Sequence, residues 1–364
     1  MSDTPTRSCG RCQTLPSLAE GAGRLFLWSP VGHSQGRLLS FLREARHEVQ
    51  VRAEVHCVEV RVPEAALSPL ASSLLAALTQ EEARATRALF MLGEAEPGLG
   101  DYARVGSLQR LARRTRAGWL VALLSEERLT THFQPIVHAQ DTRRIFAHEA
   151  LMRGLEPDGA LVPPGRMMQT AREADLLFQL DLAARTTAIR QAVKHGLDTH
   201  LFINFTPTAI YDATFCLRST VEAIHAAGIA PERVVFEIIE TDQTTDAEHL
   251  RGIVDFYRKT GFQVALDDLG AGFSSLNLIH QLRPDIIKLD MELVRDVHLD
   301  PYKGSIVEKL LEIARTLGIR TVAEGIETHE ELRWVRAHGV DFVQGYLIAR
   351  PQSPPVGATP SFTD

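Results

Sequence analysis

Two adjacent carboxylates, Asp267 and Asp268, are a candidate pair of metal ligands in this chain. They follow an apolar run over residues 262–266 and precede a turn that contains Gly270 and Gly272. Carboxylate oxygens are hard ligands that suit Mg²⁺ or Mn²⁺. Because side chains alternate along a strand, we expect the strand to stop at this pair, so that the turn lets both acids face one cation. A surface turn in which one Asp caps a helix is the competing interpretation.

Further polar residues recur where predicted strands end, and catalytic groups in (β/α)₈ barrels come from such ends. Lys288 lies between Ile287 and Leu289, where a lysine is costly to bury unless carboxylates surround it. Each acid alone also fits a helix cap or a loop charge, but the recurrence over consecutive strands favours one shared site. A Schiff base on Lys288 is a more distant alternative. The residues are Asn204, Glu237, Glu240, Asp267, Asp268, Lys288, Glu324, Glu327 and Gln344.

The elements that must position these residues are visible from Thr130 onward, where strand-like runs alternate with amphipathic helical patterns. This alternation predicts parallel β-α-β units. Roughly 230 residues of such units fit a (β/α)₈ TIM-like barrel better than an open sheet. Most of the predicted helices end at a glycine, the preferred residue just past a helix end. These glycines are Gly196, Gly228, Gly261, Gly318 and Gly339.

The N-terminal third predicts a separate small α/β domain with a sensory or regulatory role. We therefore divide the chain into this domain (residues 1–120), the barrel (residues 121–355) and a tail (residues 356–364). Several arginines between residues 104 and 116 are interpreted as a solvated face, with a nucleic-acid site as the less favoured alternative. Within the small domain we expect strands over residues 24–28 and 49–62, helical structure over 65–91, and a helix over 108–124.

Cys9 and Cys12 are the chemical hint in the small domain. The pair could bind zinc if the fold brought His33 and Cys57 to it, although the spacing matches no established zinc pattern. A redox pair is equally compatible, because close thiols lower each other's pKa. The third interpretation is two thiols near a terminus with no shared role. The ligand or signal of this domain is not identified by the sequence.

Composition limits the class of protein. The chain has 364 residues, 45% hydrophobic and 23% charged, so a full core is available. Its net charge of −7 argues against binding a nucleic-acid polymer or an anionic membrane. No apolar run is long enough to cross a membrane, and the first residues are polar. We therefore expect a soluble, cytoplasmic protein with no membrane partner.

The motifs resemble those of the EAL-domain family, bacterial signal-transduction phosphodiesterases that act on cyclic di-GMP. Glu149-Ala150-Leu151 spells the signature, which is weak evidence alone. However, the resemblance covers about two thirds of the chain, in the family order. Its other parts are Phe133-Gln134-Pro135-Ile136-Val137, Ile203-Asn204-Phe205, Phe236-Glu237-Ile238-Ile239-Glu240, Asp267 to Ser275, Ile287-Lys288-Leu289-Asp290, Ala323-Glu324-Gly325-Ile326-Glu327-Thr328 and Gln344-Gly345-Tyr346.

The resemblance implies a role for each matched residue. Lys288 would orient the attacking water, and Glu324 would be the general base. Glu240 and Glu327 would support loop 6, which is the segment from Asp267 to Ser275, and the neighbouring ligands. The residues implied to contact cyclic di-GMP are Gln134, Leu151, Arg153 and Gln344. The residues implied to hold two divalent cations, Mg²⁺ or Mn²⁺, are Glu149, Asn204, Glu237, Asp267, Asp268 and Glu324.

This ligand set suits phosphodiester hydrolysis, in which two cations acidify a water and clamp the attacking and leaving oxygens. The predicted reaction opens cyclic di-GMP to linear 5′-pGpG. A catalytically silent cyclic di-GMP receptor is the alternative. Leu269 and Phe273 stand where the family more often has phenylalanine and tyrosine, and neither change removes a ligand. The resemblance further implies a homodimer formed near loop 6 and the helix over residues 276–281.

Overall fold

The computed structural model describes residues 15, 21–210, 212–239, 247–270 and 275–362. By their contacts these residues form two compact units. The smaller unit holds the described residues up to 127 together with residues 165–177, and the larger unit holds residues 128–164 and those from 178 onward. In the described ranges no helix is both long and apolar enough to cross a membrane.

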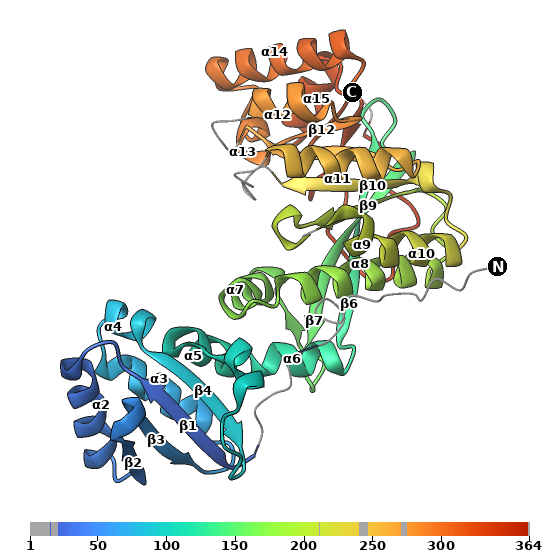
Figure 1. Cartoon of the computed structure of the whole chain (residues 1–364). Helices are drawn as coiled ribbons and strands as arrows, with labels where there is room; N and C mark the ends of the chain where they lie inside the picture. Colours follow the sequence, from blue (N-terminus) through green and yellow to red (C-terminus); the bar gives the residue numbers. More distant parts are fainter. Residues whose placement is uncertain (1–14, 16–20, 211, 240–246, 271–274, 363–364) are drawn as a thin grey trace. The chain divides into compact units, whose positions relative to one another are not determined.

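The smaller unit is built on a five-stranded antiparallel sheet with the order β2-β3-β1-β4-β5 (Figure 1). Alternation along β1 sends Leu25 and Leu27 into a core shared with helices α2 and α3, whereas Phe26 packs in a second cluster. The elements are β1 (Gly23–Trp28), α2 (Gly32–Glu44), β2 (Val49–Arg52), η1 (Ala53–Val55), β3 (Cys57–Val62), α3 (Leu67–Ala77), α4 (Gln80–Ala85), β4 (Arg87–Leu92), η2 (Leu99–Arg104), β5 (Gly106–Ser107), α5 (Leu108–Arg116), α6 (Gly118–Ser125) and α7 (Pro164–Ala174).

Three sequence predictions for this unit were wrong in detail. Residues 49–62 form a hairpin of β2 and β3, not one strand, because a 3₁₀ turn and His56 at φ 49° reverse the chain. The end of the predicted helical stretch 65–91 is β4, which pairs with β1 along its whole length. A short apolar run fits a helix or a strand equally well, so tertiary pairing decides between them. The predicted helix over 108–124 is divided at Ala117 into α5 and α6.

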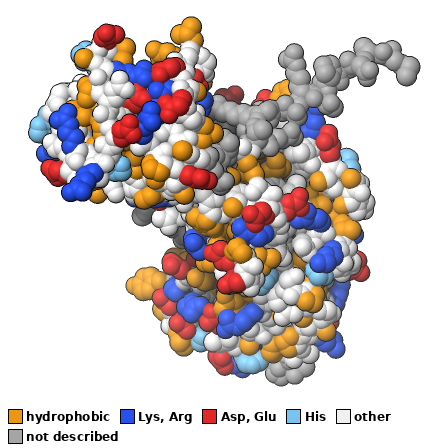
Figure 2. Space-filling model, turned by 90° about the horizontal axis from the view of Figure 1, so that it is seen from below, with side chains coloured by type: hydrophobic (Ala, Val, Ile, Leu, Met, Phe, Trp, Pro, Cys, Tyr) orange, Lys and Arg blue, Asp and Glu red, His pale blue; other side chains and the backbone are white. Residues whose placement is uncertain are grey.

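Charged side chains of both signs are interspersed on the face seen in Figure 2. In the smaller unit several of them pair closely. Arg24 Nη1 lies 2.8 Å from Glu59 Oε1 and 2.9 Å from Glu96 Oε1. Arg52 Nη1 lies 2.8 Å from Glu96 Oε2. These arginines are therefore neutralised within the fold.

The larger unit contains a closed barrel of eight strands in the order β6-β14-β13-β12-β11-β10-β9-β7, which the pairing of β6 with β7 closes. Strand β6 runs antiparallel to both neighbours, and the other neighbouring barrel strands are parallel. The predicted TIM-like barrel is confirmed, with its first strand reversed. The strands are β6 (Leu129–His138), β7 (Ile145–Leu155), β9 (His200–Phe205), β10 (Val234–Ile239), β11 (Gln263–Leu269), β12 (Ile286–Leu289), β13 (Arg320–Ala323) and β14 (Phe342–Val343), with β8 (Leu161–Val162) appended to β7.

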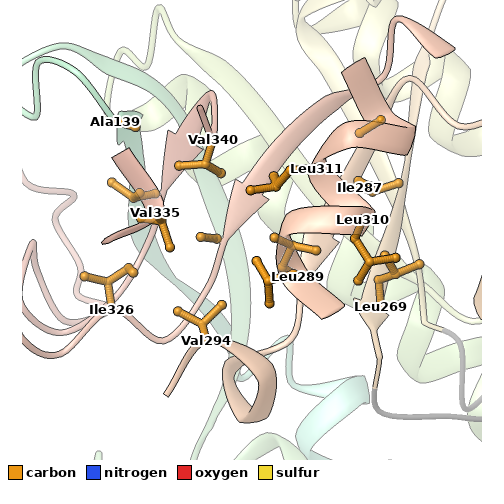
Figure 3. Packing of buried hydrophobic residues seen from close by; sticks show 14 of the residues in the cluster. Ala139, Leu269, Ile287, Leu289, Val294, Leu310, Leu311, Ile326, Val335 and Val340 are labelled. Atoms are coloured by element: carbon orange, nitrogen blue, oxygen red, sulfur yellow. The ribbon is translucent and has the colours of Figure 1, made fainter. Parts of the chain in front are cut away.

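Outward-facing side chains of the strands pack against the surrounding helices (Figure 3). Ile287 and Leu289 of β12 belong to a buried cluster that also contains Leu310 of α14 and Val335 of α15. Because neighbours alternate, Lys288 between them faces the barrel interior. The helices are α8 (Leu177–Lys194), η3 (Pro207–Ala209), α9 (Ala213–Cys216), α10 (Arg218–Ala226), η4 (Pro231–Arg233), α11 (Ala247–Lys259), α12 (Ser275–Leu282), α13 (Met291–Val294), α14 (Pro301–Leu317) and α15 (His329–Ala337).

Candidate active site

An apolar ring inside the barrel forms the floor of the candidate site. Each of the eight barrel strands contributes one buried residue to a single cluster. Large and small side chains share this ring, so the barrel has a packed floor and is not an open pore. The members are Ile136, Ala147, Phe202, Val235, Ala265, Ile286, Val322 and Phe342.

A polar ring stands one step above this floor. On every barrel strand the residue two positions toward the same rim is polar, and period-two alternation keeps it on the same inward face. The rule holds for the reversed strand β6, where the polar residue comes two positions before Ile136. The ring consists of Gln134, Glu149, Asn204, Glu237, Asp267, Lys288, Glu324 and Gln344. Every one of these residues was predicted from the sequence as a site residue.

The adjacent acids Asp267 and Asp268 are accommodated by an irregularity in β11. The strand does not stop at this pair as expected but continues one residue further, to Leu269, and its register with β12 shifts between Leu266 and Leu269. Asp268 adopts a left-handed backbone with φ 55°. A bulge of this kind turns one side chain to a new direction. It is the bulge, and not the end of the strand, that lets both acids face the same site. Carboxylate oxygens of Asp267, Asp268 and Glu324 lie within 4.8 Å of one another.

Lys288 lies at the centre of the acidic residues. Its Nζ is 2.6 Å from Glu237 Oε1, 2.7 Å from Glu324 Oε1 and 3.0 Å from Asp267 Oδ1. Glu149 Oε2 is farther away, at 3.7 Å. Burial opposes the charged form of Lys288, but the surrounding carboxylates raise its pKa well above the ordinary value. The lysine is therefore the cation that balances the site in this structure.

Glu149 is held by amide groups as well as by charge. Asn204 Nδ2 donates to its Oε1 at 3.1 Å, and Gln344 Nε2 donates to its Oε2 at 2.6 Å. Gln344 Nε2 also lies 3.1 Å from Gln134 Oε1. Although burial raises the pKa of Glu149, Lys288 and these amides outweigh burial and lower it. Glu149 is thus an ionised acceptor fixed between two strands.

The other acids hold protons more tightly than usual. Burial, and then repulsion from Glu149, raises the pKa of Glu237 well above its ordinary value. Burial also raises the pKa of Glu324 to about 8 against the pull of Lys288, with Asp267 adding to the rise. Burial and the neighbouring Asp267 raise the pKa of Asp268 to about 6. One ammonium group is therefore too little positive charge for the acids that surround it.

These residues fit divalent cations. No donor among the described residues reaches the buried Oε2 of Glu237. The donor set consists of carboxylate and amide oxygens, which Mg²⁺ and Mn²⁺ prefer. A bound cation would supply the missing positive charge, and the acids with raised pKa values would then release their protons to the solvent.

The remaining predicted residues lie in several places. Leu151 and Arg153 follow Glu149 at alternate positions of β7, so the three share one face of the strand. Arg153 Nη1 donates to the carbonyl of Met152 at 2.8 Å. Glu327 accepts from Arg295 Nη2 at 2.9 Å, and no bond from it to a metal-ligand candidate occurs among the described residues. Glu240, Cys9, Cys12 and residues 271–274 of loop 6 lie outside the described residues.

Two buried groups that support the site escaped the sequence analysis. Asp181 of α8 accepts from the backbone N–H of Thr206 at 2.8 Å, just beyond Asn204, and pairs with the fully buried Arg185 at 2.7 Å. Glu331 of α15 accepts from the N–H groups of Asp296 and Glu327 at 3.0 and 2.9 Å, which fixes the loop after Glu324. Thr328 and Glu331 also form the capping box that starts α15, and that local pattern gives no sign of the loop contact. The available signal for the first group was the spacing of Asp181 and Arg185, which are four residues apart and can pair on one face of a helix.

Together the closed barrel and its rim of acids, amides and lysine define a TIM-like barrel protein with one polar site at the carboxyl ends of its strands. Residues 117–351 match the family model described as EAL domain. The chain therefore belongs to the EAL domain family.

Similar proteins were found among named relatives and solved structures. Cyclic di-GMP phosphodiesterase PdeR of Escherichia coli K12 is 28% identical over 231 residues, covering 63% of this chain and 34% of PdeR. A standalone EAL protein from Vibrio cholerae O395, in its c-di-GMP-bound form, is 37% identical with a TM-score of 0.58, covering 64% and 95% of the two chains. BlrP1 of Klebsiella pneumoniae, in a manganese and cyclic di-GMP complex, is 25% identical with a TM-score of 0.57, covering 91% and 96%. The chain spans less than two thirds of the length of the curated relatives it matches.

Proposed function

We propose that this chain hydrolyses cyclic di-GMP to linear 5′-pGpG with the help of two divalent cations, Mg²⁺ or Mn²⁺. The observation that carries the proposal is the polar ring, in which Lys288 contacts Glu237, Asp267 and Glu324 within 3.0 Å. The relatives named as cyclic di-GMP phosphodiesterases and the neighbour in a manganese complex support it. The bound cations would acidify a water and stabilise charge on the phosphoryl group.

The protein residues would hold and orient the reactants. Asn204, Glu149, Glu237 and Asp267 would hold one cation, and Asp267, Asp268 and Glu324 the second. Arg153, Leu151, Gln134 and Gln344 would contact the nucleotide, with the Arg153 guanidinium on a phosphate. Glu240 and Glu327 would support loop 6 and the ligands.

Two side chains, Lys288 and Glu324, would act on the attacking water during hydrolysis. Lys288 would donate to the attacking water, whose oxygen bonds to phosphorus as the P–O3′ bond breaks. Glu324 would take the water proton. Without metal, burial raises its pKa to about 8, so it would act as a base near neutral pH only with the bound cations favouring its ionised form. The departing O3′ gains a proton, which gives the linear dinucleotide with a 5′ phosphate.

A hydrolysis assay tests the proposal against the receptor alternative. Purified full-length chain is incubated with cyclic di-GMP and Mg²⁺ or Mn²⁺, and the products are separated by chromatography. We expect pGpG only when a divalent cation is present. Binding of intact nucleotide without pGpG at any cation concentration would replace the proposal with the receptor.

We also propose that the smaller unit regulates this activity and that the barrel forms a homodimer near α12. The match to BlrP1 over 91% of this chain supports a shared two-part organisation. Sedimentation with and without nucleotide measures the dimer. A single sedimenting species with the mass of one chain at all concentrations would contradict it.

A further inference from the structure

A cavity of about 850 Å³ opens within the smaller unit. Its volume lies in the range of small-molecule sites, roughly 300–1,000 Å³. The lining comes from the start of α3, strand β4, the segment before β5, helices α5 and α6, and Ala174 and Leu176 at the end of α7. It shares no residue with the polar ring of the barrel.

Much of the cavity wall is apolar. Leu67, Phe90, Val121 and Leu176 are buried side chains of the lining, and Trp119 is partly exposed among them. Arg166 of α7 stacks on the Trp119 ring at 4.4 Å, which holds the indole in place. A ligand with an apolar, flat or branched body would therefore displace water from this wall favourably.

The charged part of the lining is mainly cationic. The charged residues of the lining are three arginines, Arg104, Arg110 and Arg114, and one acid, Glu64. Arg104 is bound to Asp101 at 2.8 Å, and Arg110 to Asp175 at 2.6 Å. The guanidinium of Arg114 has no hydrogen-bond or ion-pair partner within the part of the chain that the structure describes, although the charge of Asp175 attracts it from farther away.

The surroundings of Arg114 also disfavour its positive charge. It keeps access to solvent, yet partial burial and then repulsion from Arg110 lower its pKa. An unpaired guanidinium beside an apolar wall is a ready donor for a carboxylate, sulfonate or phosphate group. By contrast, Arg24 and Arg52 of the same unit are already paired with acids.

We propose that this cavity binds a small organic anion, with its apolar body against Trp119 and Phe90 and its acid group on Arg114. The site is separate from the cyclic di-GMP site and does not depend on the function proposed for the barrel. Inorganic anions are not the preferred ligands, because they have no apolar body to cover the apolar wall. Cationic ligands are disfavoured because the arginines repel them.

Two fluorescent probes test the proposal on the full-length chain. 8-Anilinonaphthalene-1-sulfonate is an apolar anion, and N-phenyl-1-naphthylamine is its neutral counterpart without the sulfonate. Titration should show saturable binding of the sulfonate, with energy transfer from tryptophan that falls in Trp119→Phe to the level that Trp28 and Trp334 supply. Arg114→Met should weaken sulfonate binding about tenfold or more, because a hydrogen bond to a charged group is lost. The same variant should leave binding of the neutral probe unchanged.

Arg113→Met is the matched control, since Arg113 is exposed on the same helix and does not line the cavity. It should bind both probes as the unchanged chain does. The proposal is overturned if Arg114→Met binds the sulfonate normally, if Arg113→Met weakens it equally, or if both probes lose the same affinity. Sulfonate binding without energy transfer from Trp119 would place the probe elsewhere and overturn it as well.

Discussion

The ammonium nitrogen of Lys288 lies 2.6 Å from Oε1 of Glu237, and both side chains are almost fully withdrawn from solvent. Neither charge is stable there alone, because burying an unpaired ion is costly. The pair also does not neutralise the site, since Glu149, Asp267 and Glu324 surround the same lysine. This imbalance underlies the first three predictions.

Lys288→Met should make the fold depend on divalent cations. Removing the buried cation of the polar ring leaves several acids uncompensated, and breaking a buried ion pair costs about 3–5 kcal/mol. We expect a lower free energy of unfolding in EDTA and a larger gain on adding Mn²⁺ than in the unchanged chain, measured by urea unfolding. Lys309→Met, an exposed lysine on α14, is the control and should change neither value. Equal Mn²⁺ gains in Lys288→Met and the unchanged chain would contradict the assignment.

Glu237→Gln should weaken cation binding while preserving the fold. Glutamine has the same shape but lacks the negative charge, and Glu237 Oε2 is buried without a donor. Calorimetric titration with Mn²⁺ should show a loss of at least about tenfold in affinity, equal to about 1.4 kcal/mol. Glu222→Gln, at an exposed site on α10, should titrate normally. Unchanged Mn²⁺ affinity in Glu237→Gln would remove Glu237 from the ligand set.

Stability without metal should fall as pH rises. Burial raises the pKa of Glu324 from 4.5 to about 8 and that of Asp268 from 3.8 to about 6. Between the ordinary and the raised pKa of each acid, the folded state holds more protons than the unfolded state. The stabilisation is therefore greatest at a pH below the ordinary pKa values of the unfolded chain, and it is lost as the pH rises toward 8. Urea unfolding in EDTA across pH 5 to 8 measures this slope.

Two comparisons identify the origin of that slope. Glu324→Gln should flatten it, because the amide does not titrate. Saturating Mn²⁺ should flatten it as well, since the cation takes the place of the protons. Stability in EDTA that rises with pH over this interval would show that the acids are not protonated in the folded state.

Asp181→Ala should destabilise the larger unit by about 3–5 kcal/mol, because it leaves Arg185 buried without its partner. Replacing both residues, as in Asp181→Leu with Arg185→Met, should recover much of that loss. The double variant still lacks the acceptor for the Thr206 amide, so its Mn²⁺ affinity should remain below normal. Urea unfolding and Mn²⁺ titration measure the two effects. A double variant as unstable as the single one would show that the charge pair is not the cause.

The polar ring could be predicted from sequence because period-two alternation is local. Once Ala265 or Ile286 is taken as inward-facing, Asp267 or Lys288 must face the same way. The chain also repeats this step on each strand, so separate motifs support one another. The barrel followed from the same regularity and from glycines such as Gly318, which has φ 70°.

Features set by tertiary contacts could not be predicted in this way. The bulge at Asp268 depends on the register between β11 and β12. Residues 87–92 form the strand β4 because they pair with β1, although their apolar sequence fits a helix equally well. The bond between Asp181 and the Thr206 amide joins a helix to the residue after β9, 25 residues away, and has no local signature in the sequence.

Helix α7 belongs by its contacts to the smaller unit, although the chain enters it from β8 and leaves it into α8 of the barrel. The polypeptide thus crosses between the units near residues 127, 164 and 177. A truncation beginning near residue 128 would leave Met167, Ala171 and Ala174, the buried residues of α7, without their packing partners. A single cut near residue 128 would therefore divide the smaller unit, because residues 165–177 of that unit lie beyond it in the chain.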